Sequence, residues 1–156
     1  MAVREILKFP NPILKRVSKR VKTIDDDILA LVQDLKDSLY STTGIGLAAP
    51  QIGVLKRVIL IDLGDDEAIL LINPVIVAKS GREESVEGCL SYPGYEGKLV
   101  RPKKITVLGM NIAGEKVEYI ADGLLAKAFC HEIDHLDGVL YMDRAKKLYK
   151  LEEENS

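Results

Sequence analysis

Apolar residues recur every three or four positions over residues 25–40 and fall on one face of a helix. They are Ile28, Leu31, Val32, Leu35 and Leu39. This spacing predicts an amphipathic helix whose apolar face packs against the core. Three consecutive aspartates at its start suit the positive amino end of the helix dipole. The following segment, residues 43–53, carries three glycines and a proline, so we do not expect it to be helical throughout.

Patterns typical of β-strands occupy the middle of the chain. Residues 57–62 and 68–78 are rich in Ile, Val and Leu, and a glycine with two aspartates between them indicates a turn. Residues 105–111 and 115–120 predict a β-hairpin around an Ala-Gly pair. Strands in the middle with helices at both ends predict an α+β fold with a largely antiparallel sheet.

A second helix is predicted over residues 123–136. Asp122 is a suitable N-cap residue, and Gly138 is suited to ending the helix. A last helix is expected to begin near Asp143 and to run into the acidic tail at residues 152–156, which we expect to be frayed.

The composition is that of an ordinary globular protein. Of 156 residues, 47% are hydrophobic and 29% are charged, and no linker or repeat divides them, so residues 1–156 are expected to form a single domain. A net charge of −2 argues against general attraction to nucleic acid. The basic segment 98–104 is expected to be a solvated loop. Because the N-terminus lacks the apolar core of a signal peptide and no apolar stretch approaches roughly 20 residues, we expect a cytoplasmic protein.

The candidate chemistry begins with the two histidines, which both lie in the pattern His131-Glu132-Ile133-Asp134-His135. Residues four positions apart project from one face of a helix, so both imidazoles can bind one metal ion. Glu132 is then placed to act as a general acid/base without being a ligand, as in zinc hydrolases with this motif. The alternative is a surface helix with unrelated histidines. The apolar turns before the motif argue against it, because a buried helix needs partners for such groups.

A catalytic site of this kind needs a third protein ligand and one open position. The chain has no third histidine, and Asp137 is too close to His135 in sequence to bind the same ion. The remaining candidates for the third ligand are a carboxylate elsewhere in the chain and Cys89. Cys89 shortly precedes Pro93 and Gly94, which are expected to form a turn. Taken alone, Cys89 is better interpreted as a small buried apolar residue. Because the site lacks a third ligand, however, we favour Cys89 as a metal ligand.

The second cysteine, Cys130, is expected to lie in the core. On a helix it points about 100° away from its neighbour His131, so it is poorly placed to bind the same ion. In a reducing compartment, an isolated pair of cysteines favours a ligand or a free thiol over a disulfide.

Three segments together resemble the peptide deformylases, which remove the N-formyl group from newly made polypeptides. The family signatures have the forms Gly-x-Gly-x-Ala-Ala-x-Gln, Glu-Gly-Cys-Leu-Ser and His-Glu-x-Asp-His. They match residues 44–51, 87–91 and 131–135 in that order. The resemblance covers essentially the whole chain and is to the bacterial type. It implies an α+β fold with antiparallel strands around a central helix that carries the His-Glu-x-x-His motif, and with helices near both termini.

The resemblance also implies roles for individual residues. The metal ligands would be Cys89, His131 and His135. The catalytic groups would be Glu132 as general acid/base, and the Gln51 amide and Leu90 backbone N–H as donors to the oxyanion. Substrate contacts would come from Gly44, Ile45, Gly46, Glu87 and Leu124. Within this set, Ile45 and Leu124 would line the pocket for the methionine side chain. An arginine that some members place within residues 92–98 cannot be carried over, so substrate contacts in that segment are left open.

The implied cofactor is one divalent metal ion, with Fe²⁺ expected in vivo and Zn²⁺, Ni²⁺ or Co²⁺ after purification. The implied partners are N-formyl-Met peptides of nascent chains and the ribosome near its exit tunnel, with no membrane and no specific DNA binding. Two alternatives compete: a zincin-type metallopeptidase that shares only the His-Glu-x-x-His motif, and a non-catalytic metal-stabilised binding module. A cysteine as third ligand argues against the first. The second needs a fourth protein ligand, which Cys130 is badly placed to supply.

Overall fold

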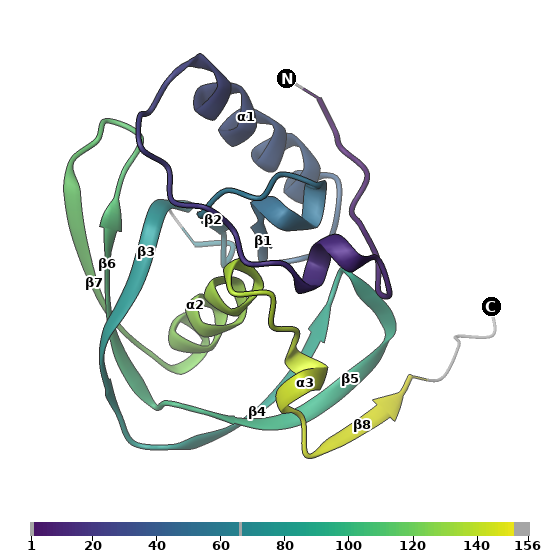
Figure 1. The fold of residues 1–156 in the computed structure, drawn as a ribbon. Coiled ribbons are helices and arrows are strands. Elements are labelled where there is room, and N and C mark those ends of the chain that lie inside the picture. The colour runs from purple at the N-terminus through teal and green to yellow at the C-terminus, as the bar shows by residue number, and fades with distance from the viewer. Residues whose placement is uncertain (1, 66, 152–156) are drawn as a thin grey trace.

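The described part of the chain folds into two antiparallel sheets arranged around one helix (Figure 1). This computed structural model describes residues 2–65 and 67–151, so the acidic tail expected to be frayed lies outside the described residues. The larger sheet has the strand order β1-β2-β3-β6-β7, and the smaller sheet has the order β4-β5-β8. The strands are β1 (Gly46–Ala48), β2 (Val58–Ile61), β3 (Ile69–Ser80), β4 (Glu83–Cys89), β5 (Tyr92–Arg101), β6 (Lys104–Met110), β7 (Lys116–Asp122) and β8 (Lys147–Lys150).

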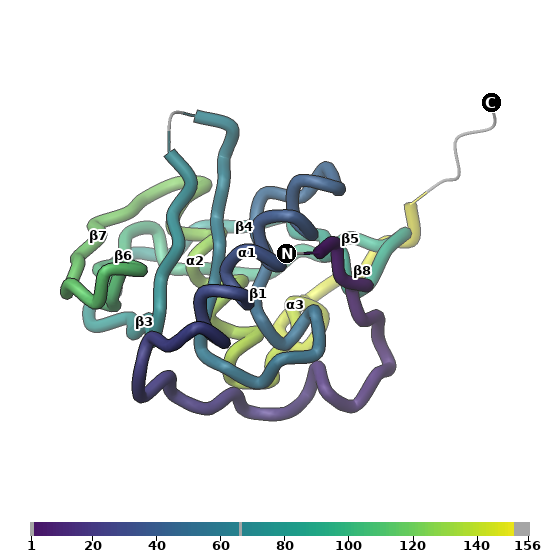
Figure 2. The backbone as a smooth tube through the Cα atoms, turned by 90° about the horizontal axis from the view of Figure 1, so that it is seen from above, coloured from purple at the N-terminus to yellow at the C-terminus, as the bar shows by residue number. Residues whose placement is uncertain are grey.

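Helix α1 (Asp26–Tyr40) forms where the sequence pattern predicts a helix. Asp25 caps it by accepting a hydrogen bond from the backbone N–H of Ile28 at 3.0 Å. Its apolar face packs on one side of the larger sheet, where it meets Val58 and Leu60 of β2. Helix α1 lies beside β1 and β2, and Figure 2 shows it from above.

Strand β2 is buried along its whole length because it lies between two helices. Its alternate residues Ile59 and Ile61 point to the opposite side from α1 and join the core around helix α2 (Gly123–Leu136). This arrangement explains the continuous apolar run of β2, which has no polar face to offer to water. Helix α2 is thereby held in the centre of the fold by Phe129 and Ile133.

The ends of α2 differ in how they are held. Asp122 occupies the N-cap position, but its side chain makes no capping hydrogen bond. At the other end Gly138 adopts φ 73°, the left-handed conformation that ends a helix. Arg57 reaches this end from outside the helix. Its guanidinium donates to the carbonyl of Leu136 at 3.0 Å and pairs with Asp137 at 2.9 Å. Asp137 is therefore engaged away from the two histidines.

The predicted helix from about Asp143 into the tail is wrong. A single helical turn, α3 (Tyr141–Arg144), is followed by strand β8, which pairs with β5 in the register Tyr95 with Lys150 and Lys98 with Lys147. The open edge of β5 offers hydrogen bonds to an extended chain, and this pairing overrides the weak local preference for helix. Two short 3₁₀ helices, η1 (Pro12–Lys15) and η2 (Ala49–Ile52), complete the secondary structure that the described residues form.

Two further expectations for the middle of the chain are wrong. The turn expected at Pro93 and Gly94 lies instead at residues 90–91, because β4 and β5 form a tight hairpin in which Cys89 pairs with Tyr92. The segment expected to be a solvated loop belongs mainly to strands, since β5 runs to Arg101. The high local charge therefore led to the wrong prediction of a loop, whereas the segment is largely strand and its residue Arg101 is buried.

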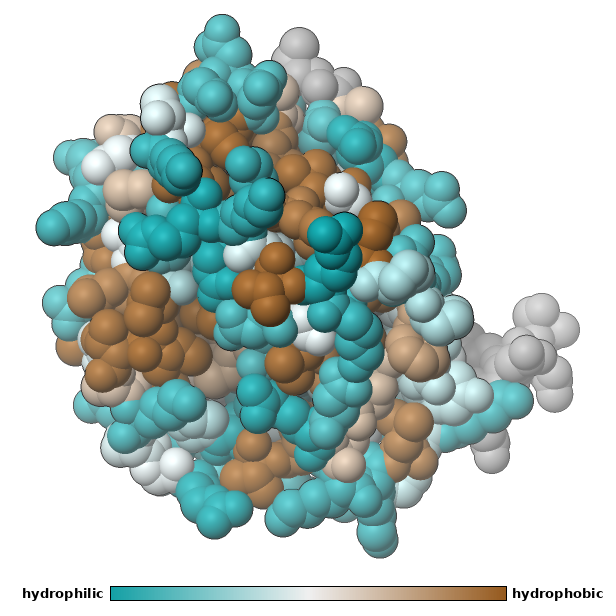
Figure 3. Space-filling model, viewed as in Figure 1, coloured by the Kyte–Doolittle hydropathy of each residue, from teal (hydrophilic) through white to brown (hydrophobic). Residues whose placement is uncertain are grey.

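The outer face of the larger sheet carries exposed apolar side chains on β3, β6 and β7. They are Val75, Val77, Leu108 and Ile120. Figure 3 shows apolar surface gathered on that side of the molecule. Among the described helices, none is long and apolar enough to cross a membrane.

Candidate metal centre and active site

Cys89, His131 and His135 meet between the end of β4 and helix α2. The sulfur of Cys89 and one ring nitrogen of each histidine all lie within 4.8 Å of one another. Sγ of Cys89 is 3.4 Å from Nε2 of His135. One thiolate and two imidazoles form a donor set that suits a divalent transition metal. The cluster found among the described residues has three members, while Cys130 is buried in the core, so the set fits an open catalytic site.

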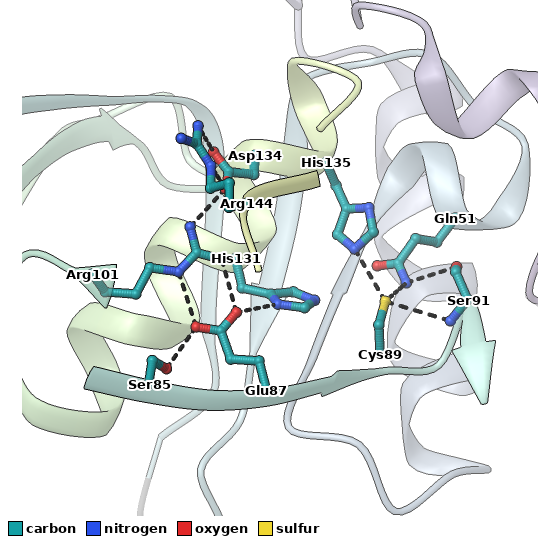
Figure 4. A network of polar contacts seen from close by, with 10 residues as sticks. All are labelled: Gln51, Ser85, Glu87, Cys89, Ser91, Arg101, His131, Asp134, His135 and Arg144. Carbon is teal, nitrogen blue, oxygen red and sulfur yellow. Dashed lines mark hydrogen bonds and ion pairs between the residues drawn. The ribbon is translucent and has the colours of Figure 1, made fainter. Parts of the chain in front are cut away.

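Glu87 orients one of the two histidines. Its Oε1 lies 2.9 Å from Nδ1 of His131, which leaves Nε2 of that ring for a metal ion (Figure 4). The other contacts of the carboxylate come from the Ser85 hydroxyl at 2.6 Å and the Arg101 guanidinium at 2.7 and 2.9 Å. Burial raises the pKa of Glu87, but the bonds from Arg101 and His131 outweigh it and hold that pKa well below its usual range. Glu87 is therefore ionised and turned toward His131.

Arg101 links the smaller sheet to helix α2, which carries both histidines, and our sequence analysis missed it. Its side chain is 4% exposed and lies between two carboxylates, Glu87 on β4 and Asp134 on α2. The Arg101 guanidinium donates to Asp134 at 2.7 Å, and Arg144 of α3 pairs with the same carboxylate at 2.8 and 3.0 Å. The sequence did contain a signal for such a residue. Asp134 lies inside the His-Glu-x-x-His motif, and a buried aspartate requires a cationic partner.

Glu132 faces the same cavity without a partner for one of its oxygens. Its Oε1 is buried and makes no hydrogen bond with any described residue. Burial raises the pKa of Glu132 to about 7, which is a value suited to both accepting and returning a proton near neutral pH. The other oxygen lies against Gly46, where an added Cβ would be 2.6 Å from Oε2. The first signature therefore places a glycine where the carboxylate needs space.

Gln51 brings its side-chain amide to the thiol of Cys89. Its Oε1 accepts a hydrogen bond from the backbone N–H of Ala48 at 2.9 Å, which fixes the direction of the amide. Its Nε2 donates to the Ser91 hydroxyl at 3.1 Å and lies 3.7 Å from Sγ of Cys89. The backbone N–H of Ser91 also points at Sγ, at 3.4 Å. Two N–H groups, on the Gln51 side chain and the Ser91 backbone, thus face the sulfur of Cys89.

The N-terminal segment fastens the two loops that carry these donors. The backbone N–H of Leu7 donates to the carbonyl of Gln51 at 2.7 Å, and the N–H of Phe9 donates to the carbonyl of Ser91 at 2.8 Å. One segment of the chain, residues 7–9, is therefore hydrogen-bonded to both the η2 turn and the hairpin turn between β4 and β5.

A cavity of about 580 Å³ lies next to the cluster formed by Cys89, His131 and His135. It brings together the residues that the sequence analysis selected as site residues. They are Gly44, Ile45, Gly46, Gln51, Glu87, Cys89, Leu90, Leu124, His131 and Glu132; His135, the third member of the cluster, is buried and does not line the cavity. Ile45 and Leu124 are 40% and 57% exposed, so apolar surface is available at this wall. The carboxylate oxygens of Glu87, by contrast, are already engaged by protein groups.

In sequence and in fold, the chain is similar to one group of enzymes. A family model described as polypeptide deformylase matches residues 3–151. A peptide deformylase of Natranaerobius thermophilus is 49% identical over 154 residues, which cover 98% of this chain and 99% of the relative. One of Carboxydothermus hydrogenoformans is 48% identical over 150 residues, covering 96% and 98%. The crystal structure of a peptide deformylase from Legionella pneumophila has a TM-score of 0.90 at 41% identity, covering 93% of this chain and 87% of that one.

Proposed function

The chain belongs to the polypeptide deformylase family, and on that premise we propose which of its residues carry the reaction. Members of this family are metal-dependent hydrolases, and the chain removes the N-formyl group from the N-terminus of newly synthesised polypeptides and releases formate. The single observation that supports our assignment of roles is the convergence of Cys89, His131 and His135 beneath the cavity that Glu132 faces.

Cys89, His131 and His135 are the metal ligands in this proposal. A divalent ion bound there supplies Lewis acidity and lowers the pKa of a water molecule. The ion in vivo is Fe²⁺, with Zn²⁺, Ni²⁺ or Co²⁺ taking its place after purification, because zinc and its neighbours bind nitrogen and sulfur sites more tightly than Fe²⁺ does. Glu87 holds His131 in the orientation that binding requires.

Glu132 is the general acid/base. Its carboxylate takes a proton from the attacking water and returns it to the departing amine, and its raised pKa of about 7 suits both transfers. The Gln51 amide and the backbone N–H of Leu90 donate hydrogen bonds to the oxyanion that develops on the formyl carbon. The bond between the Ala48 N–H and Gln51 Oε1 keeps the donating end of that amide turned to the site.

The substrate lies along the cavity with its methionine side chain against Ile45 and Leu124. Gly44 and Gly46 offer backbone atoms to the substrate along the cavity that they line, and their missing side chains leave room for Leu90 and Glu132. Glu87 was expected to contact substrate, but its oxygens are bound to Ser85, Arg101 and His131. We therefore assign Glu87 to positioning His131.

Residues 1–156 constitute one catalytic domain in this proposal, which the family match over residues 3–151 supports. The enzyme works in the cytoplasm, because nascent formylated chains appear there. It acts on them near the exit tunnel of the ribosome.

The test of the function is the release of formate from a formyl-Met dipeptide, with and without a chelator. Formate should appear only with the metal-loaded protein. Glu132→Gln should retain the metal and lose nearly all turnover, because glutamine cannot shuttle a proton. A near-unchanged turnover in this variant would contradict the role of Glu132, and formate release that survives complete metal removal would contradict the metal centre.

A further inference from the structure

Strand β7 is an open edge of the larger sheet. The strand order β1-β2-β3-β6-β7 leaves one side of β7 without a partner strand among the described residues. Figure 1 shows β7 as the outermost strand at the left of the molecule. Its register with β6 is continuous from Lys116 to Asp122, without the shifts that interrupt the pairing of β3 with β6. A regular edge of this kind is a template for pairing with another chain.

The backbone of β7 alternates between groups that bond to β6 and groups that point outward. In the hairpin before β7, the N–H of Asn111 donates to the carbonyl of Glu115 at 3.0 Å. In an antiparallel ladder, directly bonded pairs of this kind recur at every second residue. Along the continuous register, Val117, Tyr119 and Ala121 therefore bond to β6. The residues between them direct their N–H and C=O groups to the open edge, and these residues are Lys116, Glu118 and Ile120.

The ends of this edge carry opposite charges that are free to meet a partner. Lys116 and Asp122 are both exposed, and neither forms an ion pair with another described residue. Asp122 occupies the N-cap position of α2, yet its carboxylate makes no capping hydrogen bond. Between the two ends, the side chain of Ile120 is 65% exposed. The edge therefore offers a cation, an apolar side chain and an anion in sequence.

A second copy of β7, running antiparallel, complements this edge in the register centred on Tyr119. All 7 residues of the strand then overlap, and Lys116 of each copy lies opposite Asp122 of the other. Any other centre that keeps outward-pointing residues opposite each other shortens the overlap. The two nearest centres also set carboxylates against each other, either Glu118 against Glu118 or Glu118 against Asp122. Opposite charges stabilise such a cross-strand pair, and like charges destabilise it.

We propose that β7 is the interface of a homodimer, in which the β7 strands of two copies pair antiparallel about Tyr119 and join the two larger sheets into one. Backbone hydrogen bonds hold the strands together, and the Lys116–Asp122 pair, which the two-fold axis repeats, sets the register. No residue of β7 lines the cavity beside the cluster of Cys89, His131 and His135, so each copy keeps its site open. One strand pair makes a small interface, and we expect a Kd of about 10 µM to 1 mM.

Sedimentation equilibrium of the metal-loaded protein at low salt tests this dimer. The mass should rise with concentration from 17.3 kDa towards twice that value. Lys116→Glu sets like charges opposite each other at two places and should weaken the dimer about tenfold, without changing formate release per chain. Asp122→Lys should weaken it similarly, and the two substitutions together should restore it. Glu118→Pro, which removes an outward N–H that β6 does not use, should abolish the dimer while the circular dichroism spectrum is retained.

The matched control is Lys150→Glu, which makes the same change of charge on β8, an edge strand of the smaller sheet. This variant should dimerise like the unsubstituted protein. A mass of one chain at the highest concentration, or equal weakening in Lys150→Glu and Lys116→Glu, would overturn the interface. Failure of the combined substitutions to restore the dimer would overturn the register. None of these results depends on formate release, so the proposed function stands or falls separately.

Discussion

The methyl group that alanine would add at Gly46 falls on the carboxylate of Glu132, 2.6 Å from Oε2. Because this carboxylate is buried, it cannot move aside without leaving its position near Cys89, His131 and His135. We expect Gly46→Ala to fold and to bind metal, since no ligand is touched, and to lose about 10²-fold in kcat, as befits a displaced general base. Formate release and metal content measure the two effects.

Gly88→Ala is the comparison for this prediction. Gly88 lies next to Cys89, yet an added Cβ would meet nothing closer than the backbone oxygen of Tyr95 at 3.4 Å. Its loss of turnover should be clearly smaller. If both glycine variants lost the same activity, the contact between Gly46 and Glu132 would not be the cause.

Gln51 has two separable tasks in the proposed mechanism and the fold, and Gln51→Leu removes both. The loss of an oxyanion donor should reduce kcat by about 10²–10³. The backbone N–H of Ala48 also loses its acceptor in a buried place, which should lower the free energy of unfolding by about 1–3 kcal/mol. Steady-state kinetics and urea denaturation separate the two effects. A change confined to KM would mean that Gln51 only positions substrate.

At the level of elements, Arg101 joins the smaller sheet to helix α2. Removing its guanidinium leaves the carboxylates of Glu87 and Asp134 each without a principal counter-ion in a buried place. We expect Arg101→Leu to lower the free energy of unfolding by about 3–5 kcal/mol, in the range observed when one partner of a buried ion pair is removed. Urea denaturation of the metal-free protein provides the measurement.

Arg144→Leu is the control for this ion network. Arg144 contacts the same carboxylate of Asp134, but its side chain is 50% exposed, so water replaces it readily. The expected loss is about 1 kcal/mol or less. Equal losses in the two variants would show that burial of Arg101 does not govern the energy of the network.

The elements also differ in how well their sequences predicted them. Helix α1 and the β6–β7 hairpin follow from local periodicity and turn residues, and they lie where expected. Strand β8 does not, because four residues that alternate weakly become a strand only against the open edge of β5. The β4–β5 turn was misplaced for a related reason. Gly94, with φ 84°, sits inside a strand rather than in the turn.

At the level of the whole molecule, the proposed metal ligands come from two separate parts of the fold. Cys89 ends β4 of the smaller sheet, whereas His131 and His135 lie on α2, which packs on the larger sheet. An ion bound by these three residues would therefore connect the two sheets through the central helix. Binding to the folded state alone stabilises that state by mass action.

Removal of the metal should lower the thermal stability of the protein. At a metal concentration of about 100–1,000 times Kd, binding contributes about 3–4 kcal/mol. For a chain of this size, that corresponds to a rise in Tm of about 5–15 °C. Thermal unfolding with zinc and with a chelator measures the difference. In Cys89→Ser the difference should shrink strongly, whereas in Cys130→Ala it should persist. A full zinc effect in Cys89→Ser would exclude the thiol as a ligand.

The sequence by itself determined the chemistry of the centre. Two histidines and a glutamate within five helical residues are placed by helix geometry alone, and the three signatures carried the family. Only the tertiary structure decided which groups surround that chemistry. Arg101 became a buried partner of Glu87 and Asp134, and Leu151 became part of the cavity wall. These placements depend on contacts between segments far apart in the chain, and local spacing carries no information about such contacts.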